Sequence, residues 1–561
     1  MGEQPAAGNG SDRPNIFMIF SDDTSRRDFG CYGNPGVRTP NLDRLASEGM
    51  RFNNVFTTSP TCVPSRVSLY TGLYPIRNGA HPNWSSVKPD IKSLPHYMTA
   101  LGYRVVLLGK KHITPWENFP FEYYEDEDEP LGPGSALQRL LAEPGDRPFC
   151  IIMCKFSAHV PWPHNDYGYE PQAEDIPPHL IDTPDTRAMR ARYYSKITEM
   201  DAAIGRCLAL LKAEGLEENT LVIYTTDHGS DWPDEKWSLH DGGINQPFIA
   251  RWPGKIEPGS VSEALVSFVD ILPTFIETAG GDVDAVVARC GGEPLDGESF
   301  LPLLLGEADE HRTEVFANFT WGVMVAYPMR AVRTRTHKYI WNLDSHLRYT
   351  WPVDVGWWGE SQPPPALTPI ASHAAAMWDS WFEAARTDPL AAERVRALQF
   401  RPAEELYDIE ADPFEMNNLA GDPAQAEVLE SLREKVRAWM AQQGDDGGSA
   451  YHGEAGRARR FLDEFYGRQV VVNARMYYDT NEAATLELIC PVWQAEIRFT
   501  LDGSEPTRAS TLYSGPFSLS PPATIKAKAF FDGGETPLRV VEFPDIDYLF
   551  HYKYHFKPVS W

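Results

Sequence analysis

The sequence predicts an α/β protein with a mostly parallel sheet that is covered by helices on both faces. Short apolar runs of strand length alternate with longer segments of helical periodicity, as expected when helices connect neighbouring parallel strands. The runs contain few polar residues, which is typical of strands buried on both faces of a sheet. The clearest runs are Asn15–Phe20, Tyr103–Leu108, Phe149–Cys154 and Thr220–Tyr224, and the clearest helical patterns are Thr39–Gly49 and Arg187–Gly215.

Polar residues that can do chemistry follow each of these apolar runs. In open α/β sheets, ligands bind beyond the carboxyl ends of the strands, so we expect these residues to meet at one edge of the sheet. They are, in chain order, Asp22 and Asp23, Lys110 and His112, His159, and Asp227 and His228.

The three aspartates favour a cation site, although each also has a simpler interpretation. Asp22 and Asp23 would serve equally well as a helix cap or a solvated turn. With Asp227 at another strand end, however, the carboxylates would repel one another unless a cation lay between them, and a hard divalent ion is the natural choice. His228 is a less secure ligand, because imidazole is not preferred by Ca²⁺.

The other polar residues are weaker signals when each is taken alone. Lys110 and His112 are two apart in a segment expected to be extended, so they would share a face as a charge clamp beside a proton donor. A basic strand end is the simpler interpretation. His159 would equally pack on Trp162, and Lys236 lies in a segment that reads as a plain loop.

Cys62 stands at the predicted start of a helix. Polar residues precede it, no neighbouring cysteine or histidine suggests a zinc site, and seven scattered cysteines indicate no disulfide framework. Pro64 fits the first helical turn and Gly72 fits a stop. The thiol would therefore lie where free N–H groups favour an anion, and Arg66, one turn later, can point at the same place.

Composition excludes several partner classes. The chain has 561 residues and a formal net charge of −28, so we expect neither nucleic acid nor an anionic membrane as a partner. The sequence shows no apolar stretch long enough to span a membrane and no signal peptide. The expectation is a cytoplasmic protein as the sequence stands, or a periplasmic or secreted one if a signal was removed.

Four motifs occur together in an order that resembles the type I sulfatases of the alkaline-phosphatase-like superfamily. They are the Cys-x-Pro-Ser-Arg signature at Cys62–Arg66, Gly109–His112, Thr226–Gly229, and Lys236–Gly243. The resemblance covers residues 14 to 440 and implies an alkaline-phosphatase-like mixed sheet sandwiched by helices, with a small antiparallel-sheet subdomain. Tyr327–Arg333 and Glu405–Asp408 are similar to the N-sulfoglucosamine sulfohydrolase (sulfamidase) branch.

The resemblance implies that Cys62 is converted to formylglycine by a formylglycine-generating enzyme. Its hydrated aldehyde would be the nucleophile, and deprotonation of the second hydroxyl would expel sulfate. The metal ligands would be Asp22, Asp23, the modified Cys62, Asp227 and His228, usually around Ca²⁺, with Mg²⁺ or another divalent ion left open.

The resemblance also implies roles for the remaining residues. Arg66 would hold the diol, and Lys110 and Lys236 would bind sulfate oxygens. His112 would be the base that breaks down the sulfo-enzyme, and His159 the acid that protonates the leaving group.

The substrate implied is a sulfated amino sugar, either N-sulfoglucosamine or a glucosamine O-sulfate of heparan-type glycosaminoglycans. Sulfamidases tend to lose the lysine that this chain keeps as Lys236 in the general O-sulfatase pattern, which argues against N-desulfation and keeps glucosamine O-sulfate esters as candidates. Arg330 and Arg333 belong to a basic cluster that would form a glycan-binding rim, although a solvated strand face is an equal interpretation. The alternatives are a phosphonate or phosphate-ester hydrolase of the same superfamily and a catalytically silent glycan-binding protein.

The expected domains are a catalytic α/β domain over 14–310 and an antiparallel-sheet subdomain over 311–443, closed by a helix from Pro423 to Gln443. A Gly/Asp-rich linker over 444–470 follows. Residues 471–545 read as a small β-sandwich that resembles the C-terminal domain of chitobiases and hexosaminidases. The tail over 546–561 is expected to pack on the core, and the oligomeric state, including a homo-oligomer, is left open.

Overall fold

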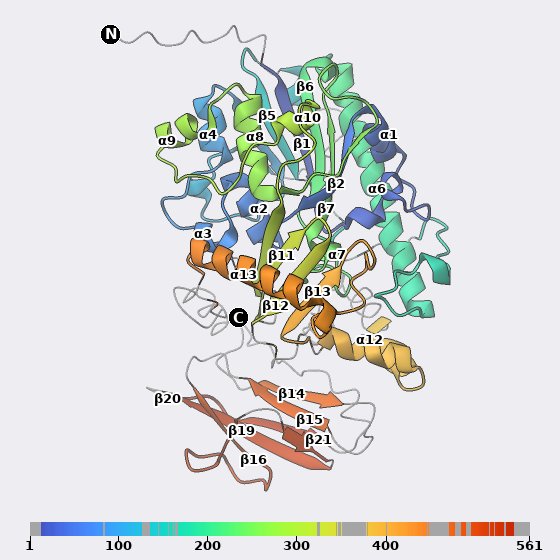
Figure 1. Ribbon diagram of the computed structural model, residues 1–561, viewed down its shortest axis with the longest axis vertical. Coiled ribbons are helices and arrows are strands. Elements are labelled where there is room, and N and C mark those ends of the chain that lie inside the picture. Colours follow the sequence, from blue (N-terminus) through green and yellow to red (C-terminus); the bar gives the residue numbers. More distant parts are fainter. Residues whose placement is uncertain are drawn as a thin grey trace.

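The computed structural model describes residues 13–81, 83, 85–125, 135–143, 145–154, 156, 158–160, 162, 166–321, 326–343, 345, 349, 377–378, 380–399, 401–445, 447, 471–476, 484–489, 495–514, 517–520, 522–531 and 534–543. Figure 1 shows a large α/β body, a second sheet below it, and a small all-β unit at the end away from the N-terminus. Among the described residues, no helix is long and apolar enough to cross a membrane.

The central sheet is mixed, with a parallel core. Its described strands run in the order β4-β3-β5-β1-β6-β7-β2-β8, and β9 pairs with β2. β1 is parallel to both β5 and β6, whereas β7 is antiparallel to β6 and β2. The strands are β1 (Asn15–Ser21), β2 (Met50–Phe56), β3 (Arg104–Gly109), β4 (Glu122–Tyr124), β5 (Phe149–Cys154), β6 (Thr220–Thr226), β7 (Asn245–Arg251), β8 (Ser260–Ser262) and β9 (Val266–Ser267).

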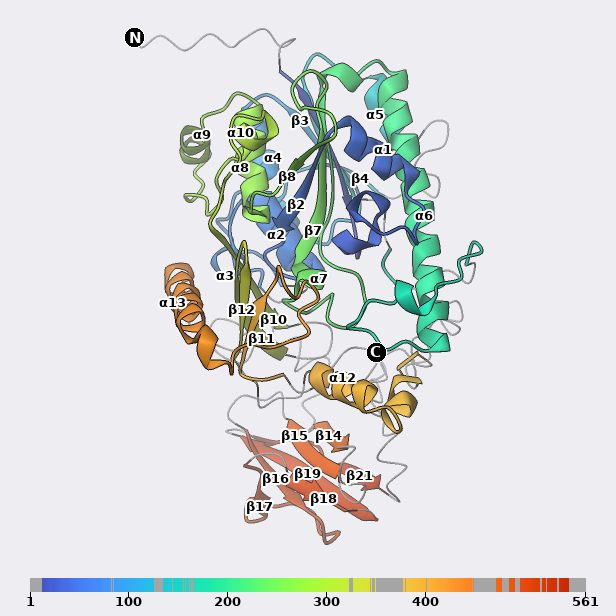
Figure 2. The same ribbon diagram turned by 45° about the vertical axis from the view of Figure 1, so that its right-hand side comes forward.

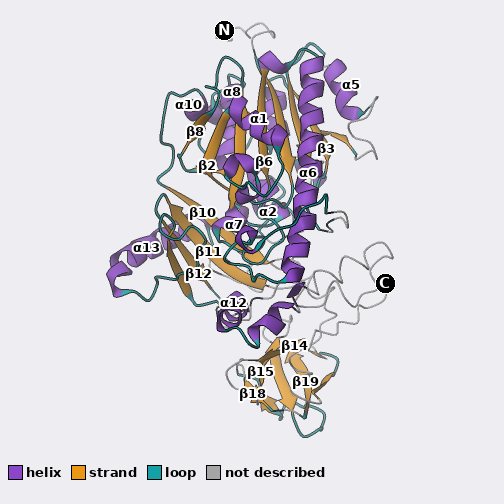
Figure 3. Ribbon diagram, turned by 90° about the vertical axis from the view of Figure 1, so that its right-hand side faces the viewer, coloured by secondary structure: helices purple, strands orange, loops and turns teal. Residues whose placement is uncertain are grey.

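Helices cover both faces of this sheet. Successive side chains of a strand point to opposite faces, and in the buried strands both sets are apolar and need cover. Phe17 and Ile19 of β1 join one core cluster, which contains α1 and α6, while Ile16 and Met18 join another, which contains α2, α4 and α8. Figure 3 shows α6 running the length of the sheet. The helices are α1 (Pro40–Glu48), α2 (Cys62–Thr71), α3 (Pro75–Asn78), α4 (Leu94–Ala100), α5 (Ala136–Ala142), α6 (Pro184–Ala213), α7 (Asp241–Ile244), α8 (Ile271–Thr278), α9 (Val283–Arg289) and α10 (Leu301–Leu304).

The second sheet is antiparallel, in the order β10-β11-β12-β13. Its strands are β10 (Glu314–Trp321), β11 (Ala326–Thr334), β12 (His337–Asn342) and β13 (Glu404–Asp408), and α12 (Pro389–Gln399) precedes β13. Helix α13 (Ala426–Gln443) packs on this sheet, where Trp439 stacks on Phe316 with ring centroids 5.1 Å apart (Figure 2). The expected closing helix is therefore present, although Pro423–Gln425 forms a 3-10 turn ahead of it.

A buried charged network joins the loop before α7 to this second sheet. His240 lies 3.2 Å from Glu405 of β13 through Nε2, and its Nδ1 lies 3.4 Å from Asp234. Arg401 also pairs with Asp234. Burial alone would lower the pKa of His240, but the carboxylates of Asp234, Glu415 and Glu405 outweigh burial and raise this pKa to about 10.

This network predicts a pH dependence of stability. The pKa of His240 is above its ordinary value of 6.5 in the folded chain. Its stabilising contribution to the free energy of unfolding is therefore complete below pH 6.5 and is lost as the pH rises toward about 10. We expect the free energy of unfolding to fall less steeply across this window in His240→Gln than in the wild type. Urea unfolding at pH 6, 8 and 10 measures both slopes, and equal slopes would contradict the prediction.

The C-terminal unit consists of two small sheets that share one core. One contains β14 (Val471–Met476), β15 (Ala484–Ile489) and β18 (Phe517–Leu519), and the other contains β16 (Glu496–Thr500), β17 (Thr511–Leu512), β19 (Ala523–Phe531), β20 (Gly534–Glu535) and β21 (Arg539–Phe543). Leu486 and Leu488 of the first sheet and Ile525 of the second belong to the same buried cluster. The predicted tail over 546–561 and most of the predicted linker lie outside the described residues.

Two local expectations need correction. The helical pattern at Arg187 begins three residues earlier, at Pro184, because the Thr183 side chain accepts a hydrogen bond from Thr186 N and proline suits the first turn. The segment after β3 is not extended, since His112 has a φ of 41°. Lys110 and His112 therefore do not share a strand face.

Candidate active site

Cys62 is the first residue of α2. Thr61 caps the helix in an extended conformation, and the chain leaves the helix at Gly72 with a φ of 67°, which suits a residue without a side chain. The thiol side chain is buried, at 3% exposure. Asn83 Oδ1 accepts a hydrogen bond from the backbone N–H of Val63 at 3.2 Å and so satisfies one free donor of this helix end.

Cations surround the Cys62 sulfur. Sγ lies 3.2 Å from His228 Nε2 and 3.6 Å from Lys110 Nζ. Burial alone would raise the pKa of the thiol, but Lys110, His228 and Lys236, with a hydrogen bond from His112, hold it well below its ordinary value. This position favours an anionic or strongly polar group on the side chain of residue 62.

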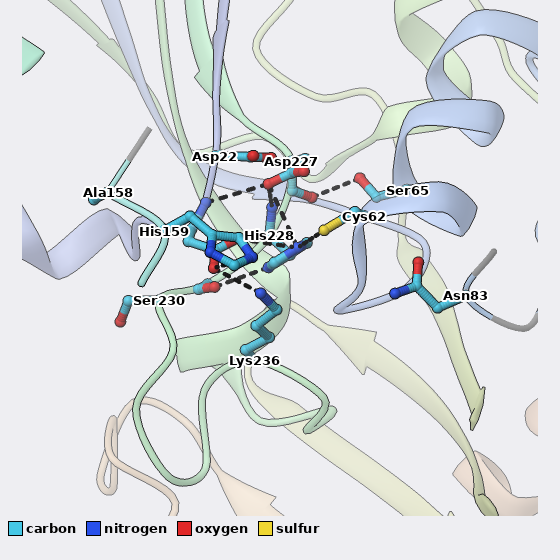
Figure 4. Close-up of polar contacts among 12 residues, drawn as sticks. Asp22, Cys62, Ser65, Asn83, Ala158, His159, Asp227, His228, Ser230 and Lys236 are labelled. Atoms are coloured by element: carbon cyan, nitrogen blue, oxygen red, sulfur yellow. Dashed lines mark hydrogen bonds and ion pairs between the residues drawn. The ribbon is translucent and has the colours of Figure 1, made fainter. Parts of the chain in front are cut away.

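The three aspartates converge on the same place from two neighbouring strands. The Asp23 backbone N–H donates to Asp227 Oδ1 at 3.3 Å. Ligand atoms of Asp23, Cys62 and His228 lie within 4.8 Å of one another, as do those of Asp22, Cys62 and Asp227. Figure 4 shows Asp22, Cys62, Asp227 and His228 gathered at the end of the sheet.

Each aspartate has a cationic neighbour. Arg66 Nη2 donates to Asp22 Oδ1 at 2.5 Å, and Nε donates to Asp227 Oδ2 at 3.0 Å. Lys110 pairs with the second oxygen of Asp22. Burial would raise the pKa of Asp22, but Lys110 and Arg66 hold it well below its ordinary range. Buried carboxylates at this spacing need such compensation.

Lys236 is held on a tightly folded loop between β6 and α7. Its Nζ donates to Asp23 Oδ2 at 2.6 Å. The preceding residue, Glu235, accepts a hydrogen bond from Ser25 Oγ at 2.6 Å, and the following one, Trp237, donates its backbone N–H to Pro60 O at 2.9 Å. These contacts tie the loop of Lys236 to the segment that leads into Cys62.

The two remaining histidines lie at the same cluster. His159 Nε2 is 3.8 Å from Asp23 Oδ2, and the side chain is 39% exposed, so it lies on the open side of the site. His112 follows β3 and hydrogen-bonds to Cys62. The structure therefore brings together the ten predicted catalytic and metal residues, which are Asp22, Asp23, Cys62, Arg66, Lys110, His112, His159, Asp227, His228 and Lys236.

Arg330 and Arg333 are not part of this cluster, and their surroundings do not support the predicted glycan-binding rim. Arg330 is 1% exposed and its guanidinium pairs with Asp445. Arg333 is also buried, with Nε 3.5 Å from Asp241. Both lie on β11 within the sheet, where these carboxylates neutralise their charges and backbone carbonyl oxygens, such as Phe319 O, accept hydrogen bonds from them. The described start of the predicted linker is thus anchored to the second sheet.

Two further residues, which the sequence did not mark as part of the site, position it. Ser65 Oγ donates to Asp227 O at 2.5 Å and so joins α2 to the end of β6. Its place inside the Cys62–Arg66 motif was the available signal. Asn83 lies 20 residues from Val63, whose N–H it accepts, and no local pattern marks it.

A solved structure shares this fold. It is a protein in complex with its substrate D-glucosamine-2-N,6-O-disulfate, with 19% sequence identity, a TM-score of 0.53, and coverage of 78% of this chain and 99% of that one. The mixed sheet, its helical layers and the separate antiparallel sheet place the chain in the alkaline-phosphatase-like class of α/β folds.

Sequence comparisons define the family more narrowly. Residues 14–134 and 134–281 match the sulfatase family, residues 227–349 match the C-terminal region of N-sulphoglucosamine sulphohydrolase, and residues 477–542 match the chitobiase/beta-hexosaminidase C-terminal domain. An ulvan-active sulfatase of Formosa agariphila is 33% identical over 463 residues, covering 78% of this chain and 81% of the relative. Human N-sulphoglucosamine sulphohydrolase is 29% identical over 476 residues, covering 77% and 91%. The chain belongs to the sulfatase family.

Proposed function

We propose that this protein is a formylglycine-dependent sulfatase that removes sulfate from an amino sugar, either N-sulfoglucosamine or a glucosamine O-sulfate of heparan-type glycans. The observation that carries this proposal is the position of Cys62 at a helix start, with His228 Nε2 and Lys110 Nζ within 3.6 Å of its sulfur. The match of residues 227–349 to the N-sulphoglucosamine sulphohydrolase C-terminal region supports the choice of substrate.

The residues around Cys62 can each take one part of the reaction. When Cys62 has been converted by a formylglycine-generating enzyme, the hydrated aldehyde supplies the attacking oxygen. Lys110 and Lys236 bind the sulfate oxygens, where negative charge grows as sulfur becomes five-coordinate. His112 takes the proton whose removal releases sulfate, and His159, on the open side of the site, donates a proton to the leaving sugar.

The donor set fits a hard divalent cation. Asp22, Asp23, Asp227 and His228 would hold it, and Ca²⁺ is the proposed ion, with Mg²⁺ or another divalent ion as the alternative. The buried Oδ1 of Asp23 has no hydrogen-bond donor among the described residues, as expected for an oxygen that faces an ion. Burial lowers the pKa of His228, but Asp227, the Cys62 thiolate and Asp23 raise it to about 9. A cation bound through this imidazole would hold it in its neutral form.

Removal of the cation should inactivate the enzyme. We expect chelation followed by dialysis to lower sulfate release by more than about tenfold and to lower the Tm, because the acids then lose a shared counter-charge. Adding Ca²⁺ back should restore both quantities. Unchanged activity and Tm in the chelated protein would contradict the cation site.

The substrate class is tested by sulfate release from N-sulfoglucosamine and from glucosamine 6-sulfate, with calcium supplied and conversion of Cys62 verified by peptide mass. Faster release from N-sulfoglucosamine would indicate that the segments similar to sulfamidases correctly predict the substrate. Faster release from glucosamine 6-sulfate would indicate that Lys236, typical of O-sulfatases, predicts the substrate better. Release from neither would contradict the proposed substrate.

A further inference from the structure

Asp231 is a buried acid that the proposed mechanism does not use. It lies between His228 and Lys236 in sequence, and the backbone turns sharply at it, since Trp232 N donates to Ser230 O at 2.8 Å. The side chain is 6% exposed. Its Oδ1 is buried and accepts no hydrogen bond from any residue that the structure describes. A buried acceptor without a donor is costly, so a donor supplied by a ligand would be strongly favoured.

Aromatic stacking places the loop of Asp231 beside the loop of His159. Trp232 stacks on Trp162 with ring centroids 4.9 Å apart. Trp162 Nε1 in turn donates to the carbonyl oxygen of Ala158, next to His159, at 2.7 Å. The acid therefore stands on the side of the site where the leaving group is proposed to receive its proton.

Asp231 also stands near the groups proposed to hold the sulfate. Lys236 Nζ and His159 Nε2 approach the same oxygen of Asp23, at 2.6 and 3.8 Å. Burial raises the pKa of Asp231, the charge of Asp23 adds to this, and Lys236 and His159 oppose it. The carboxylate thus lies within electrostatic reach of Lys236, proposed to bind sulfate, and of His159, proposed to protonate the leaving group.

We propose that Asp231 accepts a hydrogen bond from an N–H or O–H group of the leaving amino sugar and so contributes to selection of the substrate. This inference rests on the proposed function. An amino sugar carries donors on both its amine and its hydroxyl groups, whereas inorganic sulfate, which would occupy the anion pocket alone, carries none at neutral pH. A site built to pair with such a donor discriminates strongly, because the unpaired buried group is left behind when the donor is missing.

The test compares the calcium-loaded wild type with Asp231→Ala and Asp231→Asn at matched conversion of Cys62. For Asp231→Ala we expect kcat/KM on the amino sugar to fall about 10- to 100-fold, while the inhibition constant of inorganic sulfate does not rise. Asp231→Asn keeps an acceptor oxygen and should recover part of the loss. The Tm of each variant shows that it is folded.

Three outcomes would overturn the inference, and they are distinguishable. Unchanged kcat/KM on the amino sugar in Asp231→Ala would mean that the acid does not contact the sugar. Weaker inhibition by sulfate together with loss of turnover in Asp231→Ala, without recovery in Asp231→Asn, would mean that the acid maintains the anion pocket rather than contacting the sugar. Failure of the wild type itself to release sulfate from either amino sugar would overturn the proposed function, and the role of Asp231 with it.

Discussion

Replacing Cys62 with alanine is expected to lower sulfate release by at least about 10⁴-fold, because no other side chain at the site can form the aldehyde hydrate. The fold should be nearly unaffected. The change removes one buried sulfur atom and leaves the ion pairs of Asp22, Asp227 and Arg66 intact. Steady-state rates with calcium supplied, together with the Tm, measure both expectations.

Cys290→Ala is a matched control for this variant. Cys290 is half-buried after α9, and its sulfur donates a weak hydrogen bond to His96 O at 3.8 Å, away from the active site. The control should keep wild-type activity. Substantial turnover by Cys62→Ala would contradict the assignment of the nucleophile, and equal loss in both variants would point to a general effect of cysteine removal.

Replacing Arg66 with methionine is expected to lower the free energy of unfolding by about 3–5 kcal/mol, because two buried carboxylates lose their shared partner. The guanidinium bridges Asp22 and Asp227, and its own side chain is 1% exposed. Arg66→Lys keeps the positive charge but has no planar guanidinium to bridge both acids. The free energy of unfolding of this variant should therefore lie between those of Arg66→Met and the wild type. Urea unfolding in the presence of a chelator measures the effect without compensation from a cation.

Arg335→Met provides the control for a lost surface charge. Arg335 is 70% exposed and lies 3.6 Å from Glu410, so its removal should change stability by about 1 kcal/mol or less. Similar losses in Arg66→Met and Arg335→Met would show that the buried bridge contributes no more than a surface ion pair.

Much of the site could be predicted because its residues follow strands or belong to short motifs. β5 has the predicted bounds Phe149–Cys154, and β1 and β6 each extend slightly beyond their predicted ends. The carboxyl ends of parallel strands lie at the same edge of a sheet, whatever sequence connects the strands. The proximity of Asp22, after β1, to Asp227, after β6, therefore follows from the topology. The helix start at Cys62 could be predicted from Pro64 and Gly72 for equally local reasons.

What could not be predicted depends on contacts between distant segments. The basic sequence around Arg330 predicts a solvated or glycan-facing strand. In the structure, Asp445, 115 residues away, neutralises the Arg330 guanidinium instead. The backbone at His112 leaves the extended region, which no pattern of polar residues indicates. The carboxylate of Asp231 reads as part of an acidic loop, and only the tertiary structure shows that it is buried without a donor.

The proposed reaction requires that an aldehyde made from Cys62 hydrolyses the sulfate of an amino sugar. The most direct test measures sulfate release from N-sulfoglucosamine and glucosamine 6-sulfate by preparations that differ in the fraction of Cys62 converted, as determined by peptide mass. The rate on at least one sugar should rise in proportion to that fraction and extrapolate to zero for the unmodified thiol. Equal rates at all degrees of conversion, or no release by fully converted enzyme that still cleaves an aryl phosphonate, would contradict the claim.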